Sequence, residues 1–149
     1  MKMLVLGAGL QGSACAYDLL QNPSITEVRL ADKTVDHLPA FLEPYVGGER
    51  LKLITIDVKD PAAVQAAMAG VKSVMCAIPY YFNLPMSEAA IAAGAHFGDL
   101  GGNTEIVEHQ KQLNERAAAA GVTVIPDCGL APGMVNILAQ LGIDRWQVF

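Results

Sequence analysis

A glycine motif near the start of the chain constrains the fold more than any other feature. Residues 7–12 read Gly-Ala-Gly-Leu-Gln-Gly and directly follow a short apolar run at residues 3–6. Apolar residues at helical spacing then extend over residues 10–20, and a second apolar run at residues 28–31 ends on Asp32. This succession of strand, glycine turn, helix, strand and acid is typical of a dinucleotide-binding βαβ unit, so it predicts a Rossmann fold.

Each glycine of the motif has a predicted role. Gly7 permits the tight turn, Gly9 lets backbone N–H groups approach a pyrophosphate, and Gly12 lets the helix pack closely on the strand. The phosphates are expected at the helix N-terminus, because its unpaired N–H groups and its dipole favour an anion.

Asp32 and Lys33 bear on which dinucleotide is bound. A carboxylate at the end of the second strand accepts hydrogen bonds from a free ribose 2′-hydroxyl and repels a 2′-phosphate. Lys33 is the opposing signal, because it could pair with that phosphate. Since the acid holds the strand-end position and the lysine only follows it, we predict NAD rather than NADP as the cofactor.

Four further segments have the apolar or β-branched character of buried parallel strands, with helical patterns between them. The predicted strands are residues 51–58, 73–78, 96–100 and 122–126, and the predicted helices are residues 62–69, 84–93, 104–120 and 134–141, with a short helix within residues 33–48. This alternation predicts a single α/β domain with about six strands, in a doubly wound parallel sheet of order 3-2-1-4-5-6.

Composition excludes several classes of protein. With 149 residues, 52% of them hydrophobic and 17% charged, the chain is globular. A formal net charge of −5 argues against nucleic acid or an acidic membrane as partner, and no apolar run reaches the ~18 residues of a membrane span. Cys15, Cys76 and Cys128 lack metal-ligand spacing, so we expect free thiols in a reducing cytoplasm and no metal site.

The loops that follow the predicted strands hold the candidate functional residues. Tyr80 and Asn83 follow the fourth strand and are expected to reach toward the nicotinamide. Asp57 either hydrogen-bonds the adenine amino group or caps a turn. None of the loops at residues 7–12, 77–83 and 100–103 contains Arg or Lys, so the sequence offers no clamp for an anionic substrate.

Four side chains are candidates for proton transfer: Tyr80, His96, Asp99 and Asp127. His96 begins a strand, which favours a structural role. Asp99 and Asp127 end strands, where a carboxylate either transfers a proton or caps the following turn. Cys128 adjoins Asp127, whose charge disfavours a thiolate, so we expect a small packing residue there.

Three segments resemble a known family. They are MLVLGAGLQG at residues 3–12, DLGGN at residues 99–103 and IPDCGLAPGMVNILA at residues 125–139. They are similar to the amino-terminal domain of the saccharopine dehydrogenase family, and most closely to its lysine 6-dehydrogenase branch. The resemblance implies a Rossmann domain that binds NAD or NADP, a second domain that supplies most of the substrate pocket, and oxidation of a C–N bond in an amino-acid or amine substrate.

The resemblance also implies a set of cofactor-lining residues, with Tyr80 nearest the substrate. They are Gly7, Gly9, Leu10, Gln11, Gly12, Asp32, Asp57, Ala77, Pro79, Leu100, Gly101, Gly129, Ala131 and Pro132. Lys33, Val58 and Ile78 adjoin them and complete the predicted set, and Tyr80 and Asp99 are the predicted catalytic pair. Because the family continues into a second domain where this chain ends, we expect an isolated or truncated domain that binds dinucleotide and is inactive alone.

A regulatory module that senses NAD or ATP without catalysis is the alternative. The glycine-rich loops DLGGN and APG favour the dehydrogenase reading, because a sensor needs only the adenosine half of the site. Trp146, Val148 and Phe149 form an apolar tail, which indicates a partner surface or a homodimer.

Overall fold

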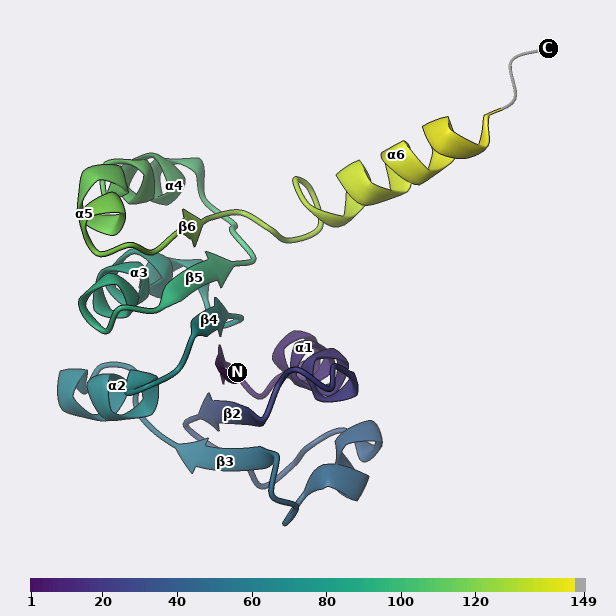
Figure 1. Ribbon diagram of the computed structural model, residues 1–149, viewed down its shortest axis with the longest axis vertical. Coiled ribbons are helices and arrows are strands. Elements are labelled where there is room, and N and C mark those ends of the chain that lie inside the picture. The colour runs from purple at the N-terminus through teal and green to yellow at the C-terminus, as the bar shows by residue number, and fades with distance from the viewer. Residues whose placement is uncertain (147–149) are drawn as a thin grey trace.

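Six parallel strands form one sheet in the computed structural model, which describes residues 1–146. Their order is β3-β2-β1-β4-β5-β6, as predicted (Figure 1). In register, Val5 lies opposite Leu30 on one side and Met75 on the other. The strands are β1 (Lys2–Leu6), β2 (Glu27–Asp32), β3 (Leu51–Thr55), β4 (Ser73–Cys76), β5 (His96–Asp99) and β6 (Val124–Ile125).

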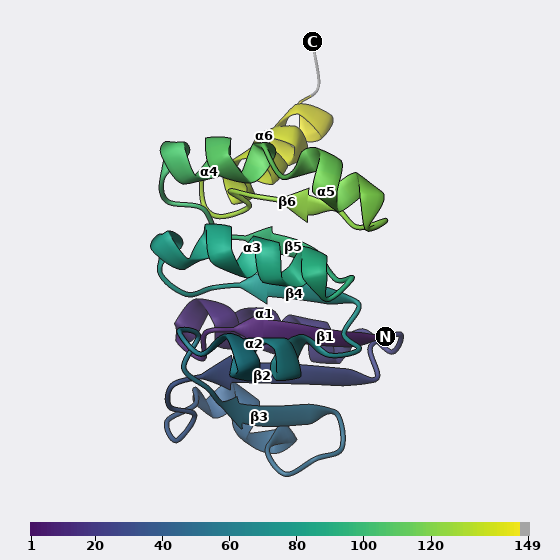
Figure 2. The same cartoon turned by 90° about the vertical axis from the view of Figure 1, so that its left-hand side faces the viewer.

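Helices cover both faces of the sheet, and Figure 2 shows the face covered by α2 to α5. That face carries α2 (Pro61–Met68), α3 (Asn83–Ala92), α4 (Thr104–Lys111) and α5 (Asn114–Ala119), and the opposite face carries α1 (Leu10–Gln21) and the 3-10 helix η1 (Ala40–Tyr45). A second 3-10 helix, η2 (Tyr80–Phe82), leads into α3.

The core has two layers, because successive side chains of a strand point to opposite faces. Val5 and Leu30 are fully buried in the layer under α1. Leu4, Val74 and Phe97 are buried in the layer under α2 and α3. Because β1 is a central strand packed between both layers, the glycine turn that follows it lies midway along the carboxyl edge of the sheet.

The helix predicted at residues 104–120 is two helices. The Gln112 N–H donates to the His109 carbonyl at 3.1 Å, and the Leu113 N–H donates to the Gln110 carbonyl at 3.0 Å. These i to i−3 bonds tighten the turn between α4 and α5, which places residues three apart on one side. Gln110 and Leu113 are consequently both buried.

Four strands are shorter than predicted: the last predicted residues of β3, β4 and β5 lie in loops, and β6 is shorter at both ends. Residues 57 and 58 follow β3 in a turn, where the Lys59 N–H donates to Asp57 Oδ1 at 2.9 Å. Residues 77 and 78 follow β4 in the same way, and β6 keeps only Val124 and Ile125 at the sheet edge.

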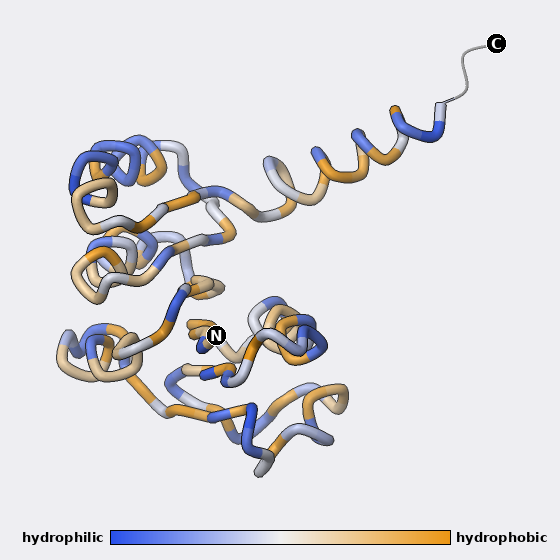
Figure 3. Tube along the Cα trace, in the orientation of Figure 1, coloured by the Kyte–Doolittle hydropathy of each residue, from blue (hydrophilic) through white to orange (hydrophobic). Residues whose placement is uncertain are grey.

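The last helix, α6 (Met134–Arg145), is longer than the predicted 134–141 and projects away from the rest of the domain (Figure 1). Every one of its residues is exposed. Figure 3 shows hydrophobic residues recurring along it. Trp146 follows it and is 78% exposed, whereas Val148 and Phe149, also predicted as an apolar tail, lie outside the described residues.

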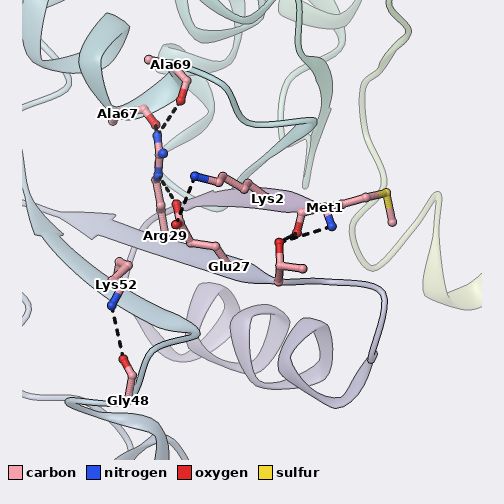
Figure 4. Close-up of polar contacts among 9 residues, drawn as sticks. Met1, Lys2, Glu27, Arg29, Gly48, Lys52, Ala67 and Ala69 are labelled. Atoms are coloured by element: carbon pink, nitrogen blue, oxygen red, sulfur yellow. Dashed lines mark hydrogen bonds and ion pairs between the residues drawn. The ribbon is translucent and has the colours of Figure 1, made fainter.

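At the edge opposite the glycine turn, Arg29 ties β2 to the end of α2 (Figure 4). Its Nε donates to Glu27 Oε1 at 2.8 Å, and its Nη1 donates to the carbonyls of Ala67 at 2.8 Å and Ala69 at 2.9 Å. Lys2 Nζ lies 3.5 Å from the other oxygen of Glu27. This network satisfies carbonyls at the end of a helix that would otherwise lack partners.

Candidate functional site

The glycine turn between β1 and α1 is closely packed on its inner side. Gly7 has φ +103°, and a Cβ there would lie 2.7 Å from the Ala77 carbonyl oxygen. A Cβ on Gly12 would collide with the Gly7 carbonyl oxygen. The structure therefore places Gly7, Gly12 and Ala77 behind the turn, where they bring the backbone of β1, α1 and the loop after β4 together.

The outer side of the turn is open. Gly9 is the N-cap of α1, and among the described residues no heavy atom lies within 4 Å of the position a Cβ would take there. In the described part of the chain this helix end has no side-chain cap, and its first turn holds no acid. Unpaired N–H groups beside free space fit a phosphate, which is the fit expected for a dinucleotide.

Asp32 ends β2 directly beside the turn. One carboxylate oxygen accepts the Ala8 N–H at 2.6 Å, and the other accepts the Lys33 N–H at 2.6 Å. The acid predicted to bind ribose therefore also holds the glycine turn in place.

A pocket of about 260 Å³ lies beside Asp32, at the ends of β2, β3 and β4; we call it the Asp32 pocket. It brings together Asp32, Lys33, Val58, Ile78 and Pro79, all of which belong to the predicted set. Sequence reasoning missed the other five lining residues, which are Ala31, Ile56, Lys59, Tyr81 and Phe82. The adjacent aromatics were visible in the sequence, but only the fold decides which rings face a pocket.

Asp57 does not line this pocket. Its carboxylate pairs with Lys33 Nζ at 3.2 Å, and both side chains are about half exposed. The pKa of Asp57 is lowered, first by the Lys59 backbone N–H and then by Lys33. The side chain thus caps the turn after β3, which is one of its two predicted roles, and holds Lys33 at the mouth of the Asp32 pocket.

A second pocket, of about 460 Å³, lies on the other side of the turn; we call it the Gln11 pocket. Its lining is Gln11, Leu100, Cys128, Gly129, Leu130 and Met134, of which Gln11, Leu100 and Gly129 were predicted. Gly9 and Leu10 line a third and larger pocket of about 880 Å³ against residues 35–39. Ala131 and Pro132 are exposed on the loop before α6.

The residues after β4 divide into an exposed and a buried part. Tyr80 is 43% exposed, and its Cβ packs near Gly102, where a Cβ would lie 3.2 Å away. Asn83 is buried, and its Oδ1 accepts a hydrogen bond from Cys76 Sγ at 3.4 Å. The expectation that Asn83 reaches the nicotinamide is therefore wrong, because this side chain turns into the core where α3 begins.

His96 and Asp99 lie at the two ends of β5. His96 Nδ1 accepts the Thr123 N–H at 3.0 Å, in agreement with the expected structural role. Asp99 is fully buried, and its carboxylate accepts three hydrogen bonds, from the N–H groups of Gly101 and Asp127 and from Gln110 Nε2. Its predicted catalytic role stays a prediction, but its contacts are those of a residue that organises loops.

The three cysteines are free, as expected. Cys128 is exposed in the Gln11 pocket, so the expected packing role is wrong. Partial burial first, and then Asp99 and Asp127, raise the pKa of its thiol, which confirms that a thiolate is disfavoured. Burial likewise raises the pKa of Cys76 to about 12.

Residues 1–146 contain neither a metal-binding cluster nor a membrane-spanning helix. No group of three or more His, Cys, Asp or Glu side chains is placed to hold a metal ion. Within the same residues, no helix has the length and apolar character needed to cross a membrane.

Residues 3–125 match the family described as the saccharopine dehydrogenase NADP binding domain. The chain belongs to this family. It is an NAD(P)-binding Rossmann domain of the saccharopine dehydrogenase type.

Two similar curated proteins are fungal enzymes. The saccharopine dehydrogenases (NADP+, L-glutamate-forming) of Saccharomyces cerevisiae and Pyricularia oryzae are each 28% identical to this chain over 143 residues. The chain spans 30% of the length of each, and 96% of the chain is aligned. The family match confirms the family expectation, whereas these relatives are named saccharopine dehydrogenases and do not support the expected lysine 6-dehydrogenase branch.

Solved structures agree on the fold. Apo saccharopine dehydrogenase (L-Glu forming) from Saccharomyces cerevisiae superposes with a TM-score of 0.75 at 28% identity, over 96% of this chain and 30% of that one. GenD2 from gentamicin A biosynthesis, solved in complex with NAD, gives a TM-score of 0.62 at 22% identity over 97% of this chain and 39% of that one. At this identity, the likeness to GenD2 shows the fold alone.

Proposed function

We propose that this domain binds the dinucleotide of an oxidoreductase that acts on a C–N bond in an amino-acid substrate. One observation carries the proposal: the open glycine turn at the N-terminus of α1 adjoins two pockets, because its Ala8 N–H binds Asp32 of the Asp32 pocket and its Gln11 lines the Gln11 pocket. A dinucleotide has that same form, with a pyrophosphate between two ring-bearing halves.

The chain's own residues orient such a ligand. The N–H groups at the start of α1 bind the pyrophosphate, the Asp32 pocket takes the adenosine half, and the Gln11 pocket takes the nicotinamide half. The nicotinamide supplies the hydride chemistry when bound. Tyr80, exposed beside Gly102, is the side chain of this chain proposed to lie nearest the substrate.

Substrate binding is proposed to need a second domain. The loops around the glycine turn, residues 7–12, 77–83, 100–103 and 127–133, contain no Arg or Lys for a substrate carboxylate. Lys33 and Lys59 lie instead at the Asp32 pocket, on the adenosine side. We therefore expect the isolated chain to bind dinucleotide and to lack dehydrogenase activity.

The free thiols agree with a proposed location in a reducing cytoplasm.

NAD is the proposed cofactor, and NADP is the alternative. Asp32 at the end of β2 favours a free 2′-hydroxyl, because a second anion beside its carboxylate is repelled. The family description and the fungal relatives' names specify NADP, which favours Lys33 as the partner of a 2′-phosphate.

Parallel calorimetric titrations with NADH, NADPH and ATP test the proposal. Tighter binding of either dinucleotide than of ATP supports it, and a preference for NADH over NADPH supports Asp32 as the selective group. Asp32→Asn should then reduce the preference, whereas Lys33→Gln should weaken NADPH alone. Equal binding of ATP and both dinucleotides would contradict the proposal and favour a nucleotide sensor instead.

A further inference from the structure

Asp99 joins two loops that are 26 residues apart in sequence. One of its carboxylate oxygens, Oδ1, accepts the Gly101 N–H at 2.7 Å and the Asp127 N–H at 3.0 Å. Its main-chain oxygen also accepts the Cys128 N–H at 2.7 Å. The loop after β5 and the loop after β6 are therefore held to the same residue.

The second carboxylate oxygen of Asp99 is held from the other side. Gln110, on α4, donates from Nε2 to Asp99 Oδ2 at 2.7 Å. Asp99 is 0% exposed and Gln110 is 2% exposed, so water does not compete for these bonds. Gln110 Oε1 has no hydrogen-bond partner among residues 1–146, so Nε2 is its only polar anchor there and depends on Asp99.

The two joined loops are in direct contact. A Cβ on Gly101, which has φ +73°, would collide with the Asp127 carboxylate. A Cβ on Gly129 would collide with the Leu100 carbonyl oxygen. Only glycines permit this approach, and the hydrogen bonds of Asp99 define where it occurs.

These loops form the wall of the Gln11 pocket. Leu100 lies between Asp99 and Gly101, and Cys128, Gly129 and Leu130 directly follow Asp127. The Asp32 pocket, in contrast, takes none of its lining from either loop. A substitution of Asp99 should therefore alter the lining of the Gln11 pocket and leave the Asp32 pocket unchanged.

We propose that Asp99 is a positioning residue, which sets the separation of the loops after β5 and β6 and thereby the affinity for the nicotinamide half of the dinucleotide. The proposal rests on the proposed function, because it assigns the nicotinamide half to the Gln11 pocket. A carboxylate suits this role because it is an acceptor on both oxygens, matching the two N–H groups on one side and Gln110 on the other.

Asp99→Ala removes all three side-chain bonds at once. We expect the dissociation constant of the preferred dinucleotide to rise tenfold or more, while that of ADP, which lacks the nicotinamide, changes less than twofold. Asp99→Asn should restore dinucleotide binding to within about threefold. Its oxygen can still accept both N–H groups, and Gln110 can turn so that its unpartnered Oε1 accepts from the new amide.

Asp57→Ala is the matched control, since Asp57 is a turn-capping acid on the opposite side of the glycine turn. Its substitution should change the affinities for ADP and for the dinucleotide by the same factor. If Asp99→Ala changes both affinities equally, or neither, the positioning role is overturned.

Amide hydrogen exchange tests the same contacts without depending on how a variant folds. In the unsubstituted chain, the N–H groups of Gly101 and Asp127 should exchange far more slowly than the N–H of Leu130, a residue that is 70% exposed. Fast exchange at both would overturn the proposal. If the unsubstituted chain binds neither ADP nor dinucleotide, the proposed function fails, while the exchange rates still decide whether Asp99 holds the loops.

Discussion

Gly9 and Gly12 belong to one motif but stand in opposite surroundings. A Cβ on Gly12 would strike the Gly7 carbonyl oxygen, whereas a Cβ on Gly9 would meet no described atom within 4 Å. We expect Gly12→Ala to lower the free energy of unfolding by roughly 1–3 kcal/mol, as overpacking of a filled site does. Urea denaturation monitored by circular dichroism measures this loss.

Gly9→Ala is the companion variant, which should change dinucleotide affinity rather than stability. Its backbone, at φ −67° and ψ −177°, is accessible to alanine, so stability should change by less than about 1 kcal/mol. The methyl group would fill the space proposed for the pyrophosphate, so affinity for dinucleotide should fall about tenfold or more, equivalent to roughly 1.4 kcal/mol. Unchanged affinity in this variant would contradict the placement of the phosphates at Gly9.

Helix α2 is held at both ends by side chains. Asp60 accepts the N–H groups of Ala62 and Ala63, and Arg29 donates to the carbonyls of Ala67 and Ala69 (Figure 4). We expect Arg29→Met to lower the free energy of unfolding by about 1–3 kcal/mol, because hydrogen bonds from a charged donor are lost. Dinucleotide affinity should stay unchanged, since Arg29 lies at the opposite edge of the sheet from the glycine turn.

The ion pair between Arg29 and Glu27 predicts that stability depends on pH. The hydrogen bond from Arg29 lowers the pKa of Glu27 below its ordinary value of 4.5. A lowered pKa in the folded state means that the stabilisation is present above pH 4.5 and is lost as the pH falls through the folded value. Stability should therefore fall as the pH is lowered below 4.5, and fall less in Arg29→Met. Parallel slopes for the two proteins in acid urea titrations would refute the contribution of this pair.

At the scale of the whole molecule, α6 is the one described α-helix with no buried residue on any side. Its apolar side chains include Ile137 at 71% exposed and Leu138 at 55% exposed. A contiguous exposed apolar surface marks an interaction site. We therefore propose that the chain self-associates through α6, which would form the homodimer predicted from the sequence.

Analytical ultracentrifugation over a concentration series measures the self-association. The double variant Leu138→Gln, Leu141→Gln should shift the chain to monomer, because positions three apart share one side of a helix. Gln140→Ala, a polar position on the same helix, is the control and should leave the association unchanged. A monomer at every concentration of the unsubstituted chain would rule out this surface as a self-interface.

Local sequence pattern was sufficient for the parts of the fold that depend on near neighbours. The glycine motif and Asp32 predicted the first βαβ unit, and the alternation of strands and helices predicted the sheet order that the structure confirms. It also predicted that Asp32 and Pro79 belong to one site, because the carboxyl ends of parallel strands meet at one edge.

Contacts between distant segments were decided only by the tertiary structure. The inward turn of Asn83, the break between α4 and α5, the meeting of Gly101 with Asp127, and the exposed course of α6 leave no periodic signal in the chain. Asp99 illustrates the reason. Its strand-end position was readable from the sequence, but its partners lie 2, 11 and 28 residues away, and only the packed sheet brings their N–H groups to one carboxylate.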